Sequence, residues 1–221
     1  SFATVDGARD VAINSVWAYV SVGNLGLQTV NISDPIDLVP GGTLDLPGFA
    51  YGLALQGNRL YVAQSQYGVA VVDVATPWAP TLVSNVDGND WPRDVAIHGT
   101  DLLVADSLAG LTIMDISQPD SPGIIGNFVT ATSCLAVSVW DDRAYLACGS
   151  GGLVIVDISN PNDPQPLGSL VFPAAATCRN VTASGDTLYA AVNDRGLFVV
   201  DVTNPANPTI IGSHDTPGTA Y

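Results

Sequence analysis

The sequence contains no lysine and no glutamate: its six basic residues are all Arg and its 21 acidic residues are all Asp, which gives a formal net charge of −15 over 221 residues. Lys and Glu are strong helix formers, whereas Asp competes for backbone hydrogen bonds and favours turns. Their absence therefore predicts an all-β chain. Hydrophobic residues make up 47% and charged residues 12%, which excludes disorder. The scarcity of cations argues against nucleic acid as a partner, because phosphate binding needs clustered Lys and Arg.

Long apolar runs are also missing. No stretch approaches the roughly 18 residues that span a bilayer, so we expect no membrane insertion. The three cysteines form no CxxC pair and have no histidine at a metal-binding spacing, so we expect no metal and no cofactor. Catalysis needs a nucleophile beside a base, a suitable pair of carboxylates or a metal set, and the sequence shows no such spacing.

A repeat fills the chain. The same phrase begins at a glycine five times, with spacings of 42, 42, 42 and 44 residues, and it ends each time at a proline. Chance does not produce such a register, and a fixed period of this length indicates a repeat architecture. The phrases are GLQTVNISDP from Gly26, GVAVVDVATP from Gly68, GLTIMDISQP from Gly110, GLVIVDISNP from Gly152 and GLFVVDVTNP from Gly196.

Each copy contains four short apolar runs. In the third copy they are 95–97, 102–105, 111–114 and 123–126, separated by turns and loops rich in Gly, Asp and Pro. Four-stranded repeats of about 40 to 50 residues are typical of β-propeller blades. We therefore predict a single β-propeller domain of four-stranded antiparallel blades over 1–221. The copies are 9–50, 51–92, 93–134, 135–178 and 179–220, and residues 1–8 are assigned to the outer strand and loop of a preceding blade.

The third strand and the turn after it resemble the LVIVD repeat of bacterial and archaeal surface proteins. GLVIVDISNPNDP at 152–164 is nearly that consensus, and the five copies cover essentially the whole chain, although the first copy has Asn31 in place of the Asp. The resemblance implies a β-propeller outside the cytoplasm, either extracellular, at the cell surface or periplasmic. It implies no catalytic residue, because the family is defined by its scaffold.

The two ends of the chain occupy the same phase of the repeat. Residues 1–9 match 213–221, so in a closed five-bladed ring both ends would compete for one outer-strand position. We therefore expect the five copies to belong to a larger propeller, such as the seven-bladed ring inferred for the family. A complete five-bladed ring is the alternative.

Residues that recur in the copies are predicted to serve the blade itself. An Asp ends the third strand in four copies, just before a Pro-bounded turn, where its carboxylate can accept hydrogen bonds from turn N–H groups. These residues are Asp73, Asp115, Asp157 and Asp201.

Two of the cysteines, Cys134 and Cys178, share one repeat position on adjacent blades. A bridge between them, with Cys148 free, is one alternative. The other, which we favour, is burial as small apolar residues, because neighbouring inner strands can exceed the roughly 7 Å Cα separation that a disulfide allows.

Residues that differ between the copies are the candidates for a binding site. Arg followed by Asp or Asn begins the first strand in three copies, and Tyr51 and Leu135 replace the Arg in the other two. The first strand of a blade is the innermost, so these residues are expected to ring one mouth of the central channel. There, neighbouring Arg and Asp residues are expected to pair, or the Arg residues bind a carboxylate or sulfate.

The loops between second and third strands and the connections between blades are expected at this same end, here called the loop end. They vary most between copies, and they carry aromatic residues that could stack on a sugar or anchor a protein. The candidate ligand-binding residues are Arg9, Asp10, Tyr51, Tyr67, Trp91, Arg93, Asp94, Arg179, Asn180, Asn193 and Arg195.

These observations favour a non-enzymatic, extracytoplasmic interaction or adhesion scaffold that presents its loop end to a protein or a surface polysaccharide. A lectin-like, carbohydrate-binding propeller is the alternative. A secreted enzyme, such as a polysaccharide lyase or a periplasmic dehydrogenase subunit, is a third and less favoured reading.

Overall fold

A computed structural model describes residues 7–87, 90–173 and 176–220, and these residues form five four-stranded antiparallel sheets with the strands in chain order. The predicted all-β propeller fold of four-stranded antiparallel blades is confirmed. The first strands are β1 (Asp10–Ile13), β5 (Leu53–Gln56), β9 (Asp94–His98), β13 (Ala136–Trp140) and β17 (Cys178–Ser184). The second strands are β2 (Trp17–Ser21), β6 (Arg59–Ala63), β10 (Asp101–Ala105), β14 (Arg143–Ala147) and β18 (Thr187–Val192).

The outer half of each sheet follows the same order. The third strands are β3 (Leu27–Asn31), β7 (Val69–Asp73), β11 (Leu111–Asp115), β15 (Leu153–Asp157) and β19 (Leu197–Asp201). The fourth strands are β4 (Val39–Leu44), β8 (Thr81–Val86), β12 (Gly123–Phe128), β16 (Gln165–Leu170) and β20 (Thr209–His214). Two short 3-10 turns, η1 (Ser65–Tyr67) and η3 (Asn193–Arg195), lie between second and third strands.

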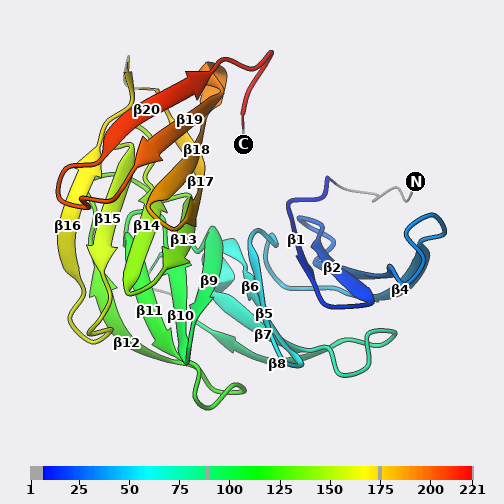
Figure 1. The fold of residues 1–221 in the computed structure, drawn as a ribbon. Coiled ribbons are helices and arrows are strands. Elements are labelled where there is room, and N and C mark those ends of the chain that lie inside the picture. The colour runs from blue at the N-terminus through cyan, green and yellow to red at the C-terminus, as the bar shows by residue number, and fades with distance from the viewer. Residues whose placement is uncertain (1–6, 88–89, 174–175, 221) are drawn as a thin grey trace.

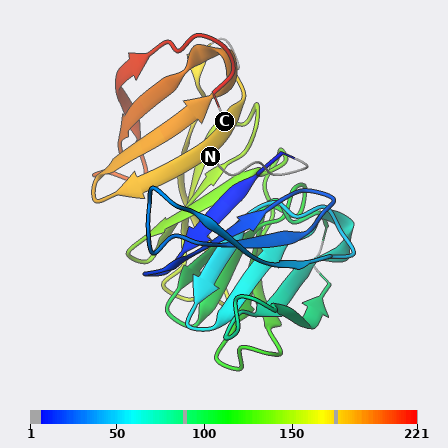
Figure 2. The ribbon, with the colours of Figure 1, turned by 90° about the vertical axis from the view of Figure 1, so that its right-hand side faces the viewer.

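The sheets are arranged radially, with their first strands innermost. Each first strand contacts the first strand of the next sheet, from β1 through β5, β9 and β13 to β17. Figure 1 shows the sheets as an arc that is open between β1 and the β17–β20 sheet, and Figure 2 shows the same two end sheets apart in a perpendicular view. The predicted assignment of 1–8 to a preceding blade falls, for 1–6, outside the described residues.

The hydrophobic core consists of four clusters, one at each interface between successive sheets. A middle sheet supplies both of its faces, because successive side chains along a strand point to opposite sides. Leu60 packs toward the first sheet, for example, and its neighbour Tyr61 packs toward the third. This two-sided burial explains why the strands read as almost continuous apolar runs.

The end sheets each keep one apolar face uncovered. Val11 on β1 is 56% exposed, whereas Val181, at the same repeat position on β17, is 3% exposed against the fourth sheet. At the other end, Leu197 on β19 is 39% exposed, whereas the equivalent Leu153 is fully buried. The apolar side chains that pack together at the four interfaces between sheets are therefore left exposed on the outer faces of the first and fifth sheets.

The recurring Asp residues serve the turns, as predicted. Asp73 accepts a hydrogen bond from the N–H of Ala75 at 2.8 Å, and Asp115 accepts one from Ser117 at 2.7 Å. Asp157 and Asp201 do the same with Ser159 and Thr203. The backbone hydrogen bonds lower the pKa of Asp115 and Asp157, and hydrogen bonds from the Thr203 side chain and backbone lower that of Asp201, because they stabilise the charged carboxylate.

The disulfide joins Cys134 to Cys148, so the alternative of a Cys134–Cys178 bridge with Cys148 free is wrong, and Cys134 is not the free apolar residue that we favoured. Cys134 precedes β13 and Cys148 follows β14, and because these strands are antiparallel neighbours the two Cα atoms lie 3.9 Å apart. Cys178 is free and buried, as the favoured interpretation holds for that residue. Burial raises the pKa of its thiol to about 12.

Candidate functional site

The loop end is held together by links between each second-to-third-strand loop and the connection that leads into the next sheet. Isolated bridges pair Gly23 with Ala50, Ser107 with Cys134 and Gly149 with Cys178. Between the second and third sheets, the N–H of Ser65 donates to the carbonyl of Pro92 at 3.3 Å. These links fix the start of each first strand, which is where the candidate site lies.

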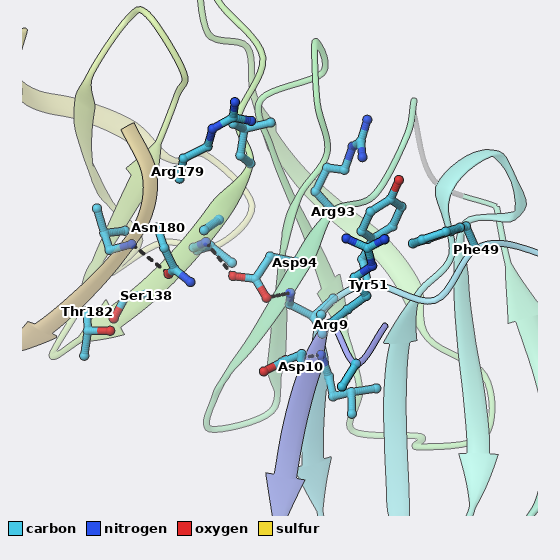
Figure 3. Close-up of a pocket in the computed structure, with 18 residues that line it drawn as sticks. Arg9, Asp10, Phe49, Tyr51, Arg93, Asp94, Ser138, Arg179, Asn180 and Thr182 are labelled. Atoms are coloured by element: carbon cyan, nitrogen blue, oxygen red, sulfur yellow. Dashed lines mark hydrogen bonds between the residues drawn. The ribbon is translucent and has the colours of Figure 1, made fainter. Parts of the chain in front are cut away.

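A cavity of about 840 Å³ lies at the starts of the five first strands (Figure 3). This volume falls in the range of small-molecule sites, which is roughly 300–1,000 Å³. Seven of the predicted site residues line it: Arg9, Asp10, Tyr51, Arg93, Asp94, Arg179 and Asn180.

The sequence reasoning missed Phe49, Ser138 and Thr182, which also line the cavity. Ser138 and Thr182 stand two residues after the Asp or Asn position of their copies, so they face the same side of the strand. The other three copies have Ala at that place, and this departure from the repeat is a signal that could have found them.

The four remaining predicted residues do not line the cavity. Tyr67 lies in η1 and is exposed, and Trp91 is exposed while its carbonyl accepts a hydrogen bond from Ser107 Oγ at 2.8 Å. Asn193 and Arg195 lie in η3. Asn193 touches the cavity wall indirectly, because its Oδ1 accepts a hydrogen bond from Arg179 Nε at 3.4 Å.

Two of the mouth arginines, Arg9 and Arg93, lie over aromatic rings near the strand starts. The guanidinium carbon of Arg93 lies 4.6 Å from the ring centre of Tyr51, and that of Arg9 lies 4.9 Å from the ring centre of Phe49. Both distances are within the range of a cation–π interaction. Arg93 Nε is buried and has no hydrogen-bond partner among the described residues.

The predicted pairing of neighbouring Arg and Asp residues is wrong for Arg9 and Arg93. Within 7–87, 90–173 and 176–220, neither Arg9 nor Arg93 forms an ion pair, whereas Arg59 pairs with Asp73 and Asp120. Figure 3 shows Arg93 and Arg179 projecting to the same side, with the carboxyl group of Asp94 turned away from both.

The aspartates instead connect successive sheets. Asp10 accepts hydrogen bonds from Val11 N–H at 2.8 Å and, in the second sheet, from Leu53 N–H at 2.7 Å. Asp94 repeats this with Val95 at 2.9 Å and, in the fourth sheet, with Val137 at 3.0 Å. Each carboxylate therefore joins the backbone of two blades.

In the second and fourth copies, which lack the Asp, other hydrogen bonds join the sheet to the next one. A Cβ atom at Gly52 would collide with Asp94, so the second copy needs Gly at this position, and Gly52 N–H donates to the carbonyl of Arg93 at 3.1 Å instead. Between the fourth and fifth sheets, Ser138 Oγ accepts a hydrogen bond from Ala183 N–H at 3.0 Å.

Asp94 is a cavity residue whose pKa is strongly shifted. Burial raises its pKa to about 7 and the nearby charge of Asp10 adds to the rise, while the hydrogen bonds from Val137 and Val95 oppose it. The charge of the cavity therefore changes near neutral pH.

Two kinds of site are not found among the described residues. No group of three His, Cys, Asp or Glu side chains is arranged to hold a metal ion. Nor does any helix in the described part of the chain have the length and apolar character needed to cross a membrane.

Comparison with known families finds one match. The model of the LVIVD repeat matches five segments that cover most of the chain, at residues 7–40, 47–88, 92–130, 133–170 and 176–216. No curated protein sequence matches the chain significantly.

Two solved structures are similar in fold. The crystal structure of the WD40 beta propeller domain of Doa1 aligns with a TM-score of 0.79 at 9% identity, over 99% of this chain and 72% of that one. The crystal structure of the computationally designed Ika8 protein aligns with a TM-score of 0.73 at 12% identity, over 96% of this chain and 63% of that one. The chain thus spans less than two thirds of the designed protein, and at these identities the likeness shows the fold alone.

Proposed function

We propose that this chain, which belongs to the LVIVD-repeat family, is a non-enzymatic interaction scaffold that presents its loop end to a protein or a surface polymer. The observation that carries the proposal is the state of the mouth arginines. Arg9 and Arg93 lie at the cavity without a carboxylate partner among the described residues, in a protein whose formal charge is −15. Folding alone does not require such an arrangement, whereas binding of a partner uses it.

A structural use of the aspartates supports binding over catalysis. In Asp10 and in Asp94, one carboxylate oxygen accepts the backbone N–H of the next residue and the other accepts a backbone N–H of a neighbouring sheet. These carboxylates are therefore better suited to hold the mouth in shape.

The disulfide supports a location outside the cytoplasm. Disulfides persist in oxidising compartments and are rare where glutathione keeps thiols reduced. The Cys134–Cys148 bridge joins the two ends of a strand pair in the fourth sheet, beside the cavity. We therefore propose that the scaffold acts in the periplasm, at the cell surface or in the extracellular medium.

A lectin-like role is the second candidate, favoured by two exposed aromatic side chains at the loop end, Tyr67 and Trp91. Exposed aromatic rings provide faces on which a sugar can stack. The exposed Trp140, at the end of β13 that is remote from the loop end, provides a matched control.

The test is binding of the purified chain to arrays of glycans and of secreted or surface proteins, with Trp91→Ala, Tyr67→Ala, Arg93→Gln and Trp140→Ala compared. We expect the three loop-end substitutions to include at least one that weakens binding tenfold or more, and Trp140→Ala to leave it unchanged. Loss on Trp91→Ala or Tyr67→Ala for a glycan identifies the lectin-like role. Equal loss for Trp140→Ala, or turnover of an arrayed polymer that Arg93→Gln abolishes, contradicts the scaffold proposal.

A further inference from the structure

Half of the cations of this chain are gathered at one cavity. Arg9, Arg93 and Arg179 come from the first, third and fifth sheets, and the sequence has only six Arg and no Lys. The others serve elsewhere: Arg59, for example, forms ion pairs with Asp73 and Asp120 on the outer part of the arc. In a strongly acidic protein, this concentration makes the cavity the place where an anion is attracted.

The guanidinium groups of Arg9 and Arg93 donate no hydrogen bond to another described residue. Stacking on a ring uses the flat face of the guanidinium and leaves its N–H groups, which lie in the plane, to bind an acceptor. Arg93 shows this most clearly, because its Nε is buried without a hydrogen-bond partner while its guanidinium carbon lies 4.6 Å from the ring centre of Tyr51. A buried donor without an acceptor is unfavourable, so a reorientation of the Arg93 side chain that brings Nε to a ligand oxygen in the cavity is favoured.

The acidic residues of the cavity do not compete for these donors. The oxygens of Asp10 and Asp94 accept backbone N–H groups, and the Asp94 carboxyl is turned away from Arg93 (Figure 3). The cavity is therefore built for an anion although it contains two acidic residues.

The shape of the donor set selects the anion. The edge formed by Nε and one Nη of an arginine carries two parallel N–H groups that match the two oxygens of a carboxylate. Ser138, Asn180 and Thr182 add polar side chains to the cavity wall from the fourth and fifth sheets, and these suit hydroxyl groups. The volume of about 840 Å³ accommodates a hydroxy acid or one to two sugar rings.

We infer that the mouth cavity binds a hydroxylated carboxylate through the edges of Arg93 and Arg9, with Arg179 adding charge. This deepens the proposed function, on which it rests, by naming the chemistry that the loop end recognises. A free hydroxy acid and a uronate unit of an acidic polysaccharide carry the same chemistry, and the test separates these two sources.

The experiment is isothermal titration of the 221-residue chain with galacturonate, a galacturonate oligomer, galactose and inorganic phosphate at two salt concentrations. We expect galacturonate to bind and galactose, which lacks the carboxylate, to bind at least tenfold more weakly. Tighter binding of the oligomer than of the monomer identifies the polysaccharide as the source, and equal binding identifies a free acid. Phosphate that binds as well as galacturonate, or the absence of binding for both galacturonate probes, overturns the inference.

Variants test whether the arginine edges carry the binding. Arg93→Gln removes the charge and the paired N–H groups of the guanidinium, and we expect it to weaken galacturonate binding at least tenfold. Arg93→Lys keeps only the charge, and we expect it to weaken binding by a smaller factor. Arg195→Gln is the control, because it removes one exposed charge at the same end without touching the cavity. A loss in Arg195→Gln equal to that in Arg93→Gln would mean a diffuse charge effect and would overturn the inference.

Arg9→Gln is the second variant, should Arg93→Gln not fold, because Arg9 is exposed and lies on a different sheet. The two proposals fail separately. If no carboxylate binds but Trp91→Ala or Tyr67→Ala still weakens binding to an arrayed partner, only the ligand class is wrong. If neither set of substitutions changes any binding, the interaction scaffold is wrong as well.

Discussion

Asp94 and Val137 join the third and fourth sheets, because Asp94 Oδ2 accepts the backbone N–H of Val137 at 3.0 Å. The same relationship links Asp10 to Leu53 one interface earlier, at the same separation of 43 residues. A carboxylate in this position exchanges water for two backbone donors. For Asp94, the desolvation of the charged carboxylate and the strength of its hydrogen bonds both depend on protonation, so the interface between the third and fourth sheets is sensitive to pH.

The first prediction concerns Asp94 and pH. The unfolded carboxyl loses its proton near its ordinary pKa of 3.8, whereas burial delays this in the folded protein until about pH 7. Between these values the folded state binds more protons, so the free energy of unfolding falls as the pH rises, by at most about 1.4 kcal/mol per unit of pKa difference. Asp94→Asn, which copies the natural Asn180, removes this fall. Urea unfolding at pH 5, 6, 7 and 8 measures it.

The charged side chains that line the cavity together with Asp94 are Asp10, Arg9, Arg179 and the adjacent Arg93. Asp10 is the one whose charge raises the pKa of Asp94. Asp115→Asn is the control, because a backbone hydrogen bond lowers the pKa of Asp115 and its titration lies below this window. An identical pH slope in the wild-type chain and in Asp94→Asn between pH 5 and 8 would contradict the assignment.

The second prediction compares two leucines at one repeat position. Leu153 is fully buried between the fourth and fifth sheets, and Leu197 is 39% exposed on the free face of the fifth. Leu153→Ala is expected to lower the free energy of unfolding by about 2–5 kcal/mol, because it leaves a cavity. Leu197→Ala is expected to lower it by less than about 1 kcal/mol. Equal losses would show that another surface covers Leu197 in solution.

The third prediction concerns the thiols. The native chain should contain one thiol and one disulfide, and the thiol of Cys178 should react with a thiol reagent at pH 8 only after unfolding, because it is buried and its pKa is raised to about 12. Cys148→Ser opens a loop with a sequence separation of 14 and is expected to lower stability by roughly 3 kcal/mol. Cys178→Ser is the control that keeps the bridge. Peptide mapping by mass spectrometry that finds Cys178 in a disulfide would contradict the pairing.

The fold could be read from the sequence because its signals are local and repeated. The phrase that begins at Gly152 contains a whole strand, its closing Asp157 and its turn, and four similar phrases confirm the period. Consecutive apolar residues such as Leu60 and Tyr61 indicate that both faces of the sheet are covered, and in a repeat of four strands radial packing of the sheets supplies this cover.

The site could be read only in part. The position of Arg93 and Asp94 at the start of an innermost strand follows from the repeat, and both line the cavity. Their pairing does not follow, because the Asp94 carboxyl is satisfied by an N–H group 43 residues away. The disulfide partner of Cys134 was not predicted for a related reason. The shared repeat position suggested Cys178 on the next blade, whereas the antiparallel pairing of β13 and β14 brings Cys148 next to Cys134.

The sequence by itself determined the strands, their turns, the number of copies and the end at which the variable residues gather, because each of these depends on neighbours within one copy. The tertiary structure alone decided which donors the carboxylates meet, which rings the arginines cover and which apolar faces stay open. Those outcomes depend on the distance and angle between one blade and the next, and no short segment of the chain contains both sides of that interface.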